Sequence, residues 1–195
     1  MSKQLNPMLK IALFGTSADP PTAGHQAILK WLSKQYDIVA VWAADNPFKN
    51  HQTSLEHRLR MLNLLIRDIQ PPRDNIQLRR ELSDRRSLIS VEKAQAIWGE
   101  QEEYTLVIGS DLAGQIRHWY RSQELLEKVK ILVIPRPGYP INQDDIEQLQ
   151  TLGGDCLIAD VFAPAVSSTD YREKGDKQAV PAPIKDYIEG QKLYA

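Results

Sequence analysis

The chain has 195 residues, of which 42% are hydrophobic, so it is long enough for one domain with a sizeable buried core. It carries 24 lysines and arginines against 25 aspartates and glutamates, and the net charge of −1 excludes a protein-wide basic field for binding nucleic acid. The single cysteine, Cys156, excludes an intrachain disulfide and a zinc site built from cysteines. The first ten residues lack the apolar core of a signal peptide, and no apolar run approaches the roughly 18 residues that span a bilayer. We therefore expect a soluble cytoplasmic protein with neither nucleic acid nor membrane as a partner.

Short apolar runs rich in valine, isoleucine and leucine predict strands buried on both faces. In chain order, they are residues 9–14, 38–43, 76–82, 104–108, 131–134 and 156–161. Stretches with helical periodicity lie between most of them, at residues 24–34, 55–67, 87–98 and 143–152. Strands that alternate with helices indicate right-handed βαβ units, so we predict a Rossmann-like α/β fold with a doubly wound parallel sheet. A single domain over residues 1–195 is expected, with its core at about 9–173 and a C-terminal helix at about 184–193 packed against it.

Three loops, at residues 18–23, 45–53 and 163–169, follow the first, second and last predicted strands, and the second of them is polar. Ligands of open α/β sheets bind beyond the carboxyl ends of the strands, so these loops are the expected binding region.

The first loop holds candidate phosphate-binding residues, although it matches neither the Walker loop nor the dinucleotide G-x-G-x-x-G pattern. Thr22 and His25 are three residues apart at a predicted helix start, so a hydroxyl, an imidazole and first-turn N–H groups converge there. The alternative is that Thr22 only caps the helix and His25 lies at the surface; the spacing alone leaves both open.

The last loop leads into residues 167–172, which read S-S-T-D-Y-R. Ser167 or Ser168 would cap the helix that begins there, and Arg172 would lie about one turn later and reach back toward a bound anion. Capping serines are common, so this pattern alone is weak.

Together, the two segments resemble the signatures of the nucleotidyltransferase superfamily with the (H/T)-x-G-H motif. Residues 15–25 (GTSADPPTAGH) are similar to the first signature and residues 167–172 to the second, S-x-T-x-x-R. Further segments narrow the resemblance to nicotinate/nicotinamide mononucleotide adenylyltransferases over most of residues 9–194. These are residues 46–49 (NPFK, for N-P-x-x-K), 55–62, 108–112 with Trp119 and Tyr120 (for G-x-D…W), and 134–139 (IPRPGY, for R-P-G-Y).

The resemblance implies transfer of AMP from ATP to nicotinate or nicotinamide mononucleotide, which gives the dinucleotide and pyrophosphate in NAD biosynthesis. It implies ATP and the mononucleotide as partners, and Mg²⁺ bound through phosphates and water instead of protein ligands. The implied catalytic residues are Thr22, His25, Lys49 and Arg172; the ATP-binding residues are Gly15, Thr16, Ser17, Gly24, Ser167, Ser168 and Thr169; the mononucleotide-binding residues are Asp111, Trp119, Tyr120 and Arg136.

Each of the middle residues also has a plainer interpretation. Lys49 could be a solvated loop residue, Trp119 could belong to the core, and Asp111 could cap the helix that it opens. Arg58, at a helix start, would pair with a carboxylate such as Glu56. The remaining histidines are expected at the surface; they are His51, His57 and His118.

Three departures from the family pattern bear on function. Thr22 stands where bacterial members usually have histidine, and residues 15–19 (GTSAD) lack the second glycine and the phenylalanine of G-G-T/S-F-D. Residues 87–92 (SLISVE) stand where nicotinate-preferring members show S-Y-T-x-x-T. The preference between the two mononucleotides is therefore open, with nicotinate favoured by the match at residues 109–111 and 119–120.

The sequence leaves two alternative functions: a nucleotidyltransferase of the same fold that acts on 4′-phosphopantetheine or a polyol phosphate, and a non-catalytic nucleotide sensor. The sequence leaves the oligomeric state open, and a homo-oligomer is compatible with it.

Overall fold

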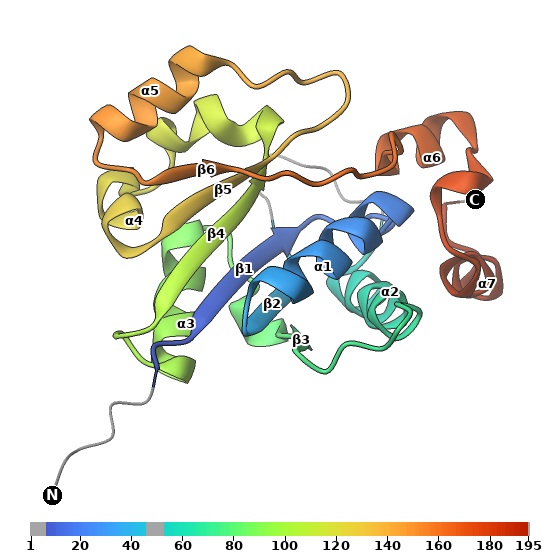
Figure 1. Ribbon diagram of the computed structural model, residues 1–195. Coiled ribbons are helices and arrows are strands. Elements are labelled where there is room, and N and C mark those ends of the chain that lie inside the picture. Colours follow the sequence, from blue (N-terminus) through green and yellow to red (C-terminus); the bar gives the residue numbers. More distant parts are fainter. Residues whose placement is uncertain (1–6, 46–52, 195) are drawn as a thin grey trace, which may run out of the picture.

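A parallel sheet lies at the centre of the computed structural model, which describes residues 7–45 and 53–194 (Figure 1). Its strands are β1 (Lys10–Thr16), β2 (Ile38–Ala43), β3 (Ile76–Leu78), β4 (Glu103–Gly109), β5 (Lys130–Ile134) and β6 (Cys156–Ile158). They pair in the order β3-β2-β1-β4-β5-β6, and each of these pairs is parallel. The predicted doubly wound parallel sheet is confirmed.

The order of the strands indicates where a ligand would bind. From β1 the chain proceeds to β2 and β3 on one side, and it then returns to place β4 on the other side of β1. The connections after β1 and β4 therefore diverge at the carboxyl edge of the sheet, which is the usual position of a ligand crevice in this architecture.

Helices cover both faces of the sheet, and each face has its own core. One face carries α1 (Ala23–Gln35), α2 (Leu55–Arg67) and α7 (Ala182–Gln191); the other carries α3 (Ser87–Trp98), the 3₁₀ helix η2 (Ser110–His118), α4 (Ser122–Lys128) and α5 (Gln143–Thr151). Successive side chains of a strand point to opposite faces. Thus Ala12 and Phe14 of β1 lie in the first core, and Ile11 and Leu13 lie in the second.

The structure corrects three details of the predicted elements. The strand predicted over 76–82 ends at Leu78, and Arg80–Leu82 form a 3₁₀ turn instead. The preceding Arg79 is partly buried, with its guanidinium 5.1 Å from the centre of the Trp98 ring. The charged residues Arg79, Arg80 and Glu81 are costly to bury, which disfavours a longer buried strand here. The strand predicted over 156–161 ends at Ile158, at the edge of the sheet. The short helix α4 has no counterpart among the predicted helices.

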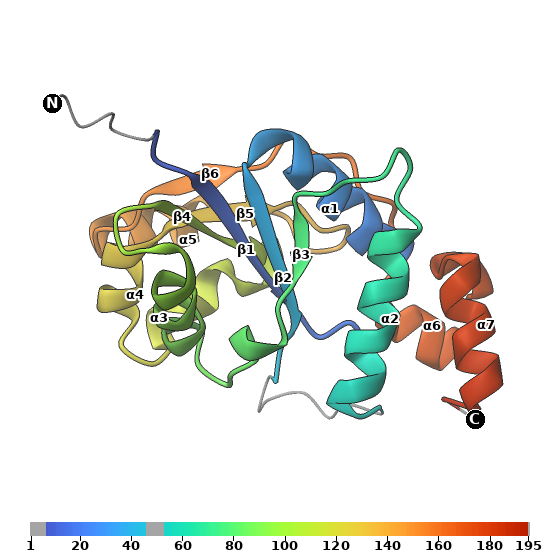
Figure 2. The same cartoon turned by 90° about the horizontal axis from the view of Figure 1, so that it is seen from below.

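The C-terminal part of the chain folds back onto α2. After α6 (Ser168–Lys174), the chain makes the 3₁₀ turn η3 (Lys177–Ala179) and enters α7, and Figure 2 shows α7 beside α2 and α6. Ile184 and Ile188 of α7 are buried in the first core. Within the described ranges, no helix has the length and apolarity to span a membrane.

Candidate active site

The loop between β1 and α1 begins at Gly15, and its neighbour on β2 explains the glycine. Gly15 lies opposite Trp42 in the β1–β2 register. A Cβ atom at Gly15 would lie 2.7 Å from two carbons of the Trp42 indole, which is 3% exposed. The packing of β1 against β2 thus requires a glycine at this position. Thr16 ends β1, and its carbonyl accepts from the N–H of Ala44.

Thr22 and His25 hold each other at the start of α1. The backbone N–H of Thr22 donates to Nδ1 of His25 at 3.0 Å, and the Thr22 hydroxyl lies 2.8 Å from the same nitrogen. Because Nδ1 accepts the Thr22 N–H, a neutral His25 carries its proton on Nε2. The imidazole is therefore oriented to donate through Nε2. Thr22 is 1% exposed and is also the N-cap residue of α1. Its position as a helix cap is therefore compatible with its contact to His25.

The two signature segments meet at residues 19 and 20. The Ser168 hydroxyl donates to the Pro20 carbonyl at 2.7 Å, and Nη1 of Arg172 donates to the Asp19 carbonyl. The sequence separations of these bonds are 148 and 153 residues. A Cβ atom at Gly24 would lie 3.5 Å from the Pro164 carbonyl, so α1 also packs closely against the loop that precedes α6.

Of the two serines expected as candidates for the helix cap, Ser167 is the one that caps α6. Its hydroxyl oxygen accepts from the Asp170 N–H at 3.0 Å, and it lies 2.6 Å from an Asp170 carboxylate oxygen. Thr169 Oγ1 accepts weakly from Nη2 of Arg172 at 3.4 Å. The structure thus brings Thr22, His25, Arg172 and the hydroxyls of α6 to one region.

Arg58 is a buried brace for this region, which corrects the expectation that it pairs with Glu56. Its side chain is 2% exposed, and Nη1 donates to the carbonyls of Ser17 at 3.0 Å and Ala44 at 2.7 Å. Glu56 instead pairs with Arg60 and Arg80 at the surface. Burial lowers the pKa of Arg58, while the negative charge of Asp19 opposes that shift. The guanidinium therefore ties the ends of β1 and β2 together.

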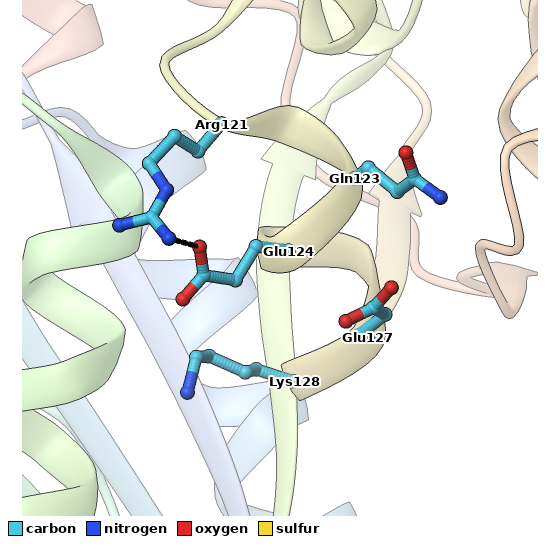
Figure 3. A pocket seen from close by; sticks show the side chains of 5 residues that line it. All are labelled: Arg121, Gln123, Glu124, Glu127 and Lys128. Atoms are coloured by element: carbon cyan, nitrogen blue, oxygen red, sulfur yellow. Dashed lines mark ion pairs between the residues drawn. The ribbon is translucent and has the colours of Figure 1, made fainter.

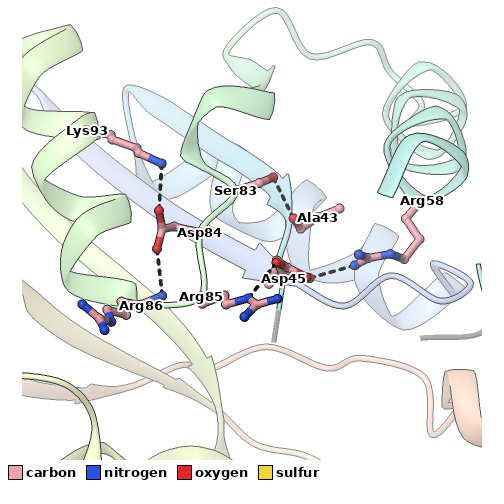
Figure 4. A network of polar contacts seen from close by, with 9 residues as sticks. Ala43, Asp45, Arg58, Ser83, Asp84, Arg85, Arg86 and Lys93 are labelled. Atoms are coloured by element: carbon pink, nitrogen blue, oxygen red, sulfur yellow. Dashed lines mark hydrogen bonds and ion pairs between the residues drawn. The ribbon is translucent and has the colours of Figure 1, made fainter. Parts of the chain in front are cut away.

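The loop after β2 contains Asn46, Pro47, Phe48 and Lys49, and these residues lie outside the described ranges, so the position predicted for Lys49 is not tested. Figure 4 shows the contacts made by the residues just before this loop. Ser83 donates to the Ala43 carbonyl at 2.8 Å, and Arg85 contacts Asp45 at 3.3 Å. Residues 83–85 therefore pack against the carboxyl end of β2.

Asp84 anchors the start of α3 within the same network. It accepts from Lys93 at 3.0 Å and from the Arg86 N–H at 3.1 Å. Burial raises the pKa of Asp84, but the hydrogen bond from Lys93 and those from the backbone N–H groups of Arg86 and Arg85 lower it more, so the pKa lies below its usual value.

A second cluster of expected site residues lies at the carboxyl ends of β4 and β5. Oδ2 of Asp111 forms an ion pair with Nη1 of Arg136 at 2.7 Å, while the buried Oδ1 has no hydrogen-bond partner among the described residues. Asp111 therefore pairs across two strands instead of capping η2. A Cβ atom at Gly109 would lie 2.4 Å from Oδ1 of Asp111 and 2.8 Å from Cδ of Arg136, so the pair requires a glycine there.

The turn that carries Arg136 is fixed by Ser110. The Ser110 hydroxyl donates to the Tyr139 carbonyl at 2.6 Å and accepts from the Arg136 N–H at 3.0 Å. Gly138 has a φ of 80°, which suits a turn with proline one position earlier. The R-P-G-Y segment is therefore a rigid turn at the end of β5.

Trp119 and Tyr120 differ in their surroundings. Trp119 is half-buried and packs against the second core, whereas Tyr120 is 44% exposed. The Arg86 guanidinium lies 4.2 Å from the centre of the Tyr120 ring, a cation–π contact between the start of α3 and the end of η2. Arg121 follows in the left-handed region with φ 49° and turns the chain into α4.

Two surface pockets differ in their relation to these residues. A small pocket is lined by Arg136, Pro137, Ala165, Val166, Ser167 and Asp170. Its lining comes from the turn after β5 and from the start of α6. Arg136 of the second cluster therefore lies close to Ser167 of the second signature. A larger and more open pocket is lined by side chains of Arg121 and α4 alone, and it includes none of the expected site residues (Figure 3). Arg121 pairs with Glu124 there.

The other histidines are placed as follows. Nδ1 of His57 lies 2.8 Å from the Tyr187 hydroxyl, and this histidine is half-buried, not at the surface as expected. His118 is exposed, and His51 lies outside the described residues. No three histidine, cysteine or acidic side chains gather into a metal-binding cluster within residues 7–45 and 53–194.

Sequence reasoning assigned no role to three residues that organise the site: Asp19, Thr53 and Tyr194. Asp19 is 2% exposed and accepts from Thr53 and Tyr194. The available sequence signal was an aspartate followed by two prolines in the first loop. Its partners come from distant parts of the chain, and no spacing rule indicates them.

Comparison with known proteins gives a consistent result. A family model described as cytidylyltransferase-like matches residues 13–174. A Synechocystis protein named probable nicotinate-nucleotide adenylyltransferase is 48% identical, and the match covers 95% of this chain and 99% of that protein. The nicotinate-nucleotide adenylyltransferase of Bacillus subtilis is 28% identical over 96% of this chain and 99% of its own. A solved structure of Plasmodium falciparum nicotinic acid mononucleotide adenylyltransferase, complexed with NaAD, shares the fold with a TM-score of 0.81 at 18% identity, covering 95% of this chain and 97% of that one.

Proposed function

The chain belongs to the cytidylyltransferase-like family and, within it, to the nicotinate-nucleotide adenylyltransferases, and from this premise we propose how its own residues act. The protein is a nucleotidyltransferase of NAD biosynthesis that transfers AMP from ATP to nicotinate or nicotinamide mononucleotide, with pyrophosphate as the second product. The observation that carries the residue assignment is the junction of the two signatures at Asp19 and Pro20, where Ser168 and Arg172 contact the first loop.

In this proposal, the 5′-phosphate of the mononucleotide attacks the α-phosphorus of ATP in line, and pyrophosphate leaves. No protein nucleophile takes part, so catalysis consists of positioning the reactants and stabilising the charge that develops. His25 donates through Nε2 to a phosphate oxygen at the reacting phosphorus, and Thr22 holds the imidazole in that orientation. The fixed tautomer supports this role because the donor needs no reorientation when charge accumulates.

The leaving pyrophosphate is assigned to Lys49 and Arg172. Arg172 lies at the junction of both signatures, and its guanidinium can bind two phosphate oxygens at once. Ser167, Ser168 and Thr169 supply hydroxyl and backbone donors from α6, and residues 15–17 with Gly24 form the surface for the adenylate. ATP enters as its Mg²⁺ complex: the imidazole, hydroxyl and guanidinium groups around Thr22 suit phosphate oxygens, and Mg²⁺ commonly keeps phosphate and water ligands in such sites.

The mononucleotide is assigned to the second cluster. Arg136 fixes one oxygen of Asp111, and the other oxygen, which has no partner among the described residues, is the proposed acceptor for a ribose hydroxyl. Trp119 and Tyr120 are the proposed aromatic surface for the pyridine ring. ATP would then bind beyond β1, and the mononucleotide beyond β4 and β5, on either side of the place where the connections after β1 and β4 diverge. We propose one nucleotidyltransferase domain over residues 1–195, with no nucleic-acid partner.

Pyrophosphate release from ATP, measured with each mononucleotide in turn, tests the proposal. We expect nicotinate mononucleotide to give a kcat/KM about tenfold above that of nicotinamide mononucleotide. The carboxylate of nicotinate is charged, so it would accept stronger hydrogen bonds from backbone N–H groups near Trp119 and Tyr120 than the neutral amide would. Equal values, or a preference for the amide, would show that residues 87–92 govern the pocket. Turnover with 4′-phosphopantetheine or a polyol phosphate, but not with either mononucleotide, would contradict the assignment of the second cluster.

A further inference from the structure

Tyr194, near the end of the chain, reaches the loop that carries Thr22 and His25. Its hydroxyl donates to Oδ1 of Asp19 at 2.5 Å, across 175 residues of sequence. Thr53 Oγ1 donates to the same oxygen at 2.7 Å. Asp19 itself is 2% exposed, so these donors satisfy a buried carboxylate between β1 and α1.

A specific turn brings Tyr194 back to this position. Lys192 ends α7 in the left-handed region with φ 53°. The N–H of Leu193 donates to the Ile188 carbonyl and the N–H of Lys192 donates to the Glu189 carbonyl, the two bonds of a Schellman motif. Glycine usually takes the left-handed position of this motif because a side chain there is strained. The chain adopts the turn with a lysine, and the turn directs Tyr194 toward Asp19.

Tyr194 also contacts the helix of the second signature. Its ring packs edge-on against Tyr171 of α6, with the ring centres 5.9 Å apart and the planes at 80°. The same helix contributes Arg172, which donates to the Asp19 carbonyl. One side chain after α7 therefore touches both the carboxylate in the first signature and the helix of the second.

We propose that Tyr194 is a positioning residue for adenylyl transfer, which holds Asp19 and thereby sets the first loop, with Thr22 and His25, against α6. The inference rests on the proposed function, because it assigns Tyr194 a part in placing the ATP-binding residues. Tyr194 does not touch the reacting atoms. It acts through Asp19, whose carboxylate lies three residues before Thr22.

The tyrosine remains a donor throughout the working pH range. Burial and the hydrogen bond to Asp19 both raise the pKa of Tyr194 above its usual value. The Tyr194 hydroxyl therefore stays protonated near neutral pH and remains a donor to Asp19.

The test compares Tyr194→Phe with Tyr187→Phe. Both substitutions delete one hydroxyl from the C-terminal segment, but the Tyr187 hydroxyl contacts His57 on α2 and not the first loop. We expect Tyr194→Phe to lower kcat about tenfold and to raise KM for ATP, because small misplacements of reacting groups cost large factors in rate. KM for the mononucleotide should change less than twofold, and Tyr187→Phe should leave all three constants near wild type.

A second readout does not depend on turnover. Amide hydrogen exchange in the substrate-free protein should become faster in Tyr194→Phe at the four residues of 17–22 that carry an amide hydrogen, since residues 20 and 21 are prolines. It should remain at the wild-type rate there in Tyr187→Phe. Both changes together support the proposal. Wild-type kinetics in Tyr194→Phe, unchanged exchange at residues 17–22, or an equal loss of activity in Tyr187→Phe would each overturn it. Absence of turnover in the wild-type protein would instead contradict the proposed function, and the exchange experiment would still decide whether Tyr194 holds the loop.

Discussion

The imidazole of His25 is oriented by hydrogen bonding to Thr22 before any substrate binds. We predict that His25→Ala lowers kcat by about two orders of magnitude or more, since removing one preorganised donor to developing charge typically costs that much. The residue is only half-buried, so the fold should persist. Steady-state pyrophosphate release, together with circular dichroism of the variant, provides the measurement.

His57→Ala is the matched control, because His57 contacts Tyr187 and no expected site residue in the described structure. It should keep near-wild-type turnover. Nearly normal turnover in a folded His25→Ala protein would refute the catalytic assignment of His25.

Arg172 provides the second prediction at the scale of single residues. Arg172→Ala and Lys49→Ala should raise KM for ATP and lower kcat more than they alter KM for the mononucleotide, because both cations are assigned to the leaving pyrophosphate. Arg172→Lys should not restore full activity, since lysine lacks the planar fork that binds two oxygens. Kinetics with ATP varied at saturating mononucleotide separate these effects.

Lys174→Ala serves as the control within α6, where Lys174 contacts Asp170 at the surface. It should leave the ATP constants unchanged. If ATP kinetics are also unchanged in both Arg172→Ala and Lys49→Ala, the phosphates must bind elsewhere.

The pairing of β1 with β2 determines what the first signature can tolerate. A Cβ at Gly15 would lie 2.7 Å from the Trp42 indole, which is fixed in the second core. We predict that Gly15→Ala lowers the free energy of unfolding by about 1–3 kcal/mol, the usual cost of overpacking a core. Urea denaturation of the variant measures the loss.

Gly24→Ala is a suitable comparison for stability, because a Cβ there would make ordinary contacts at 3.4 Å or more, and alanine favours a helix. It should be as stable as the wild type or more so. An unchanged unfolding free energy in Gly15→Ala would show that the Trp42 indole can shift.

At the scale of the whole molecule, α7 connects the end of the chain to the first core. Ile184 is fully buried on the α2 side of the sheet. We predict that Ile184→Ala lowers the free energy of unfolding by roughly 2–5 kcal/mol through lost burial and the cavity that remains. Thermal or urea unfolding checks this value.

Ile97→Ala tests the same chemical change at an exposed helical position, since Ile97 is 41% exposed on α3. Its effect should lie within about 0.5 kcal/mol. Equal effects in the two variants would mean that α7 contributes little to the core.

Periodicity predicted the strongest elements well. The strand over Ile38–Ala43 and the helices over Leu55–Arg67 and Ser87–Trp98 have the predicted bounds. Their apolar residues follow the pattern of a strand buried on both faces or of a helix buried on one side. The third and last strands are shorter than predicted. Both lie at edges of the sheet, where few neighbours enforce an extended backbone.

The sequence by itself determined the fold class, the family and the identity of the candidate groups, because these depend on local periodicity and on motifs of fixed spacing. Only the tertiary structure decided which groups meet: Arg58 with the carbonyls of Ser17 and Ala44, Asp111 with Arg136, and Tyr194 with Asp19. These contacts join residues 14 to 175 positions apart. One physical reason is the parallel sheet, which brings the carboxyl ends of distant strands to one edge. The other is that a buried charge is costly without a partner, and the partner can come from any part of the chain that folds next to it.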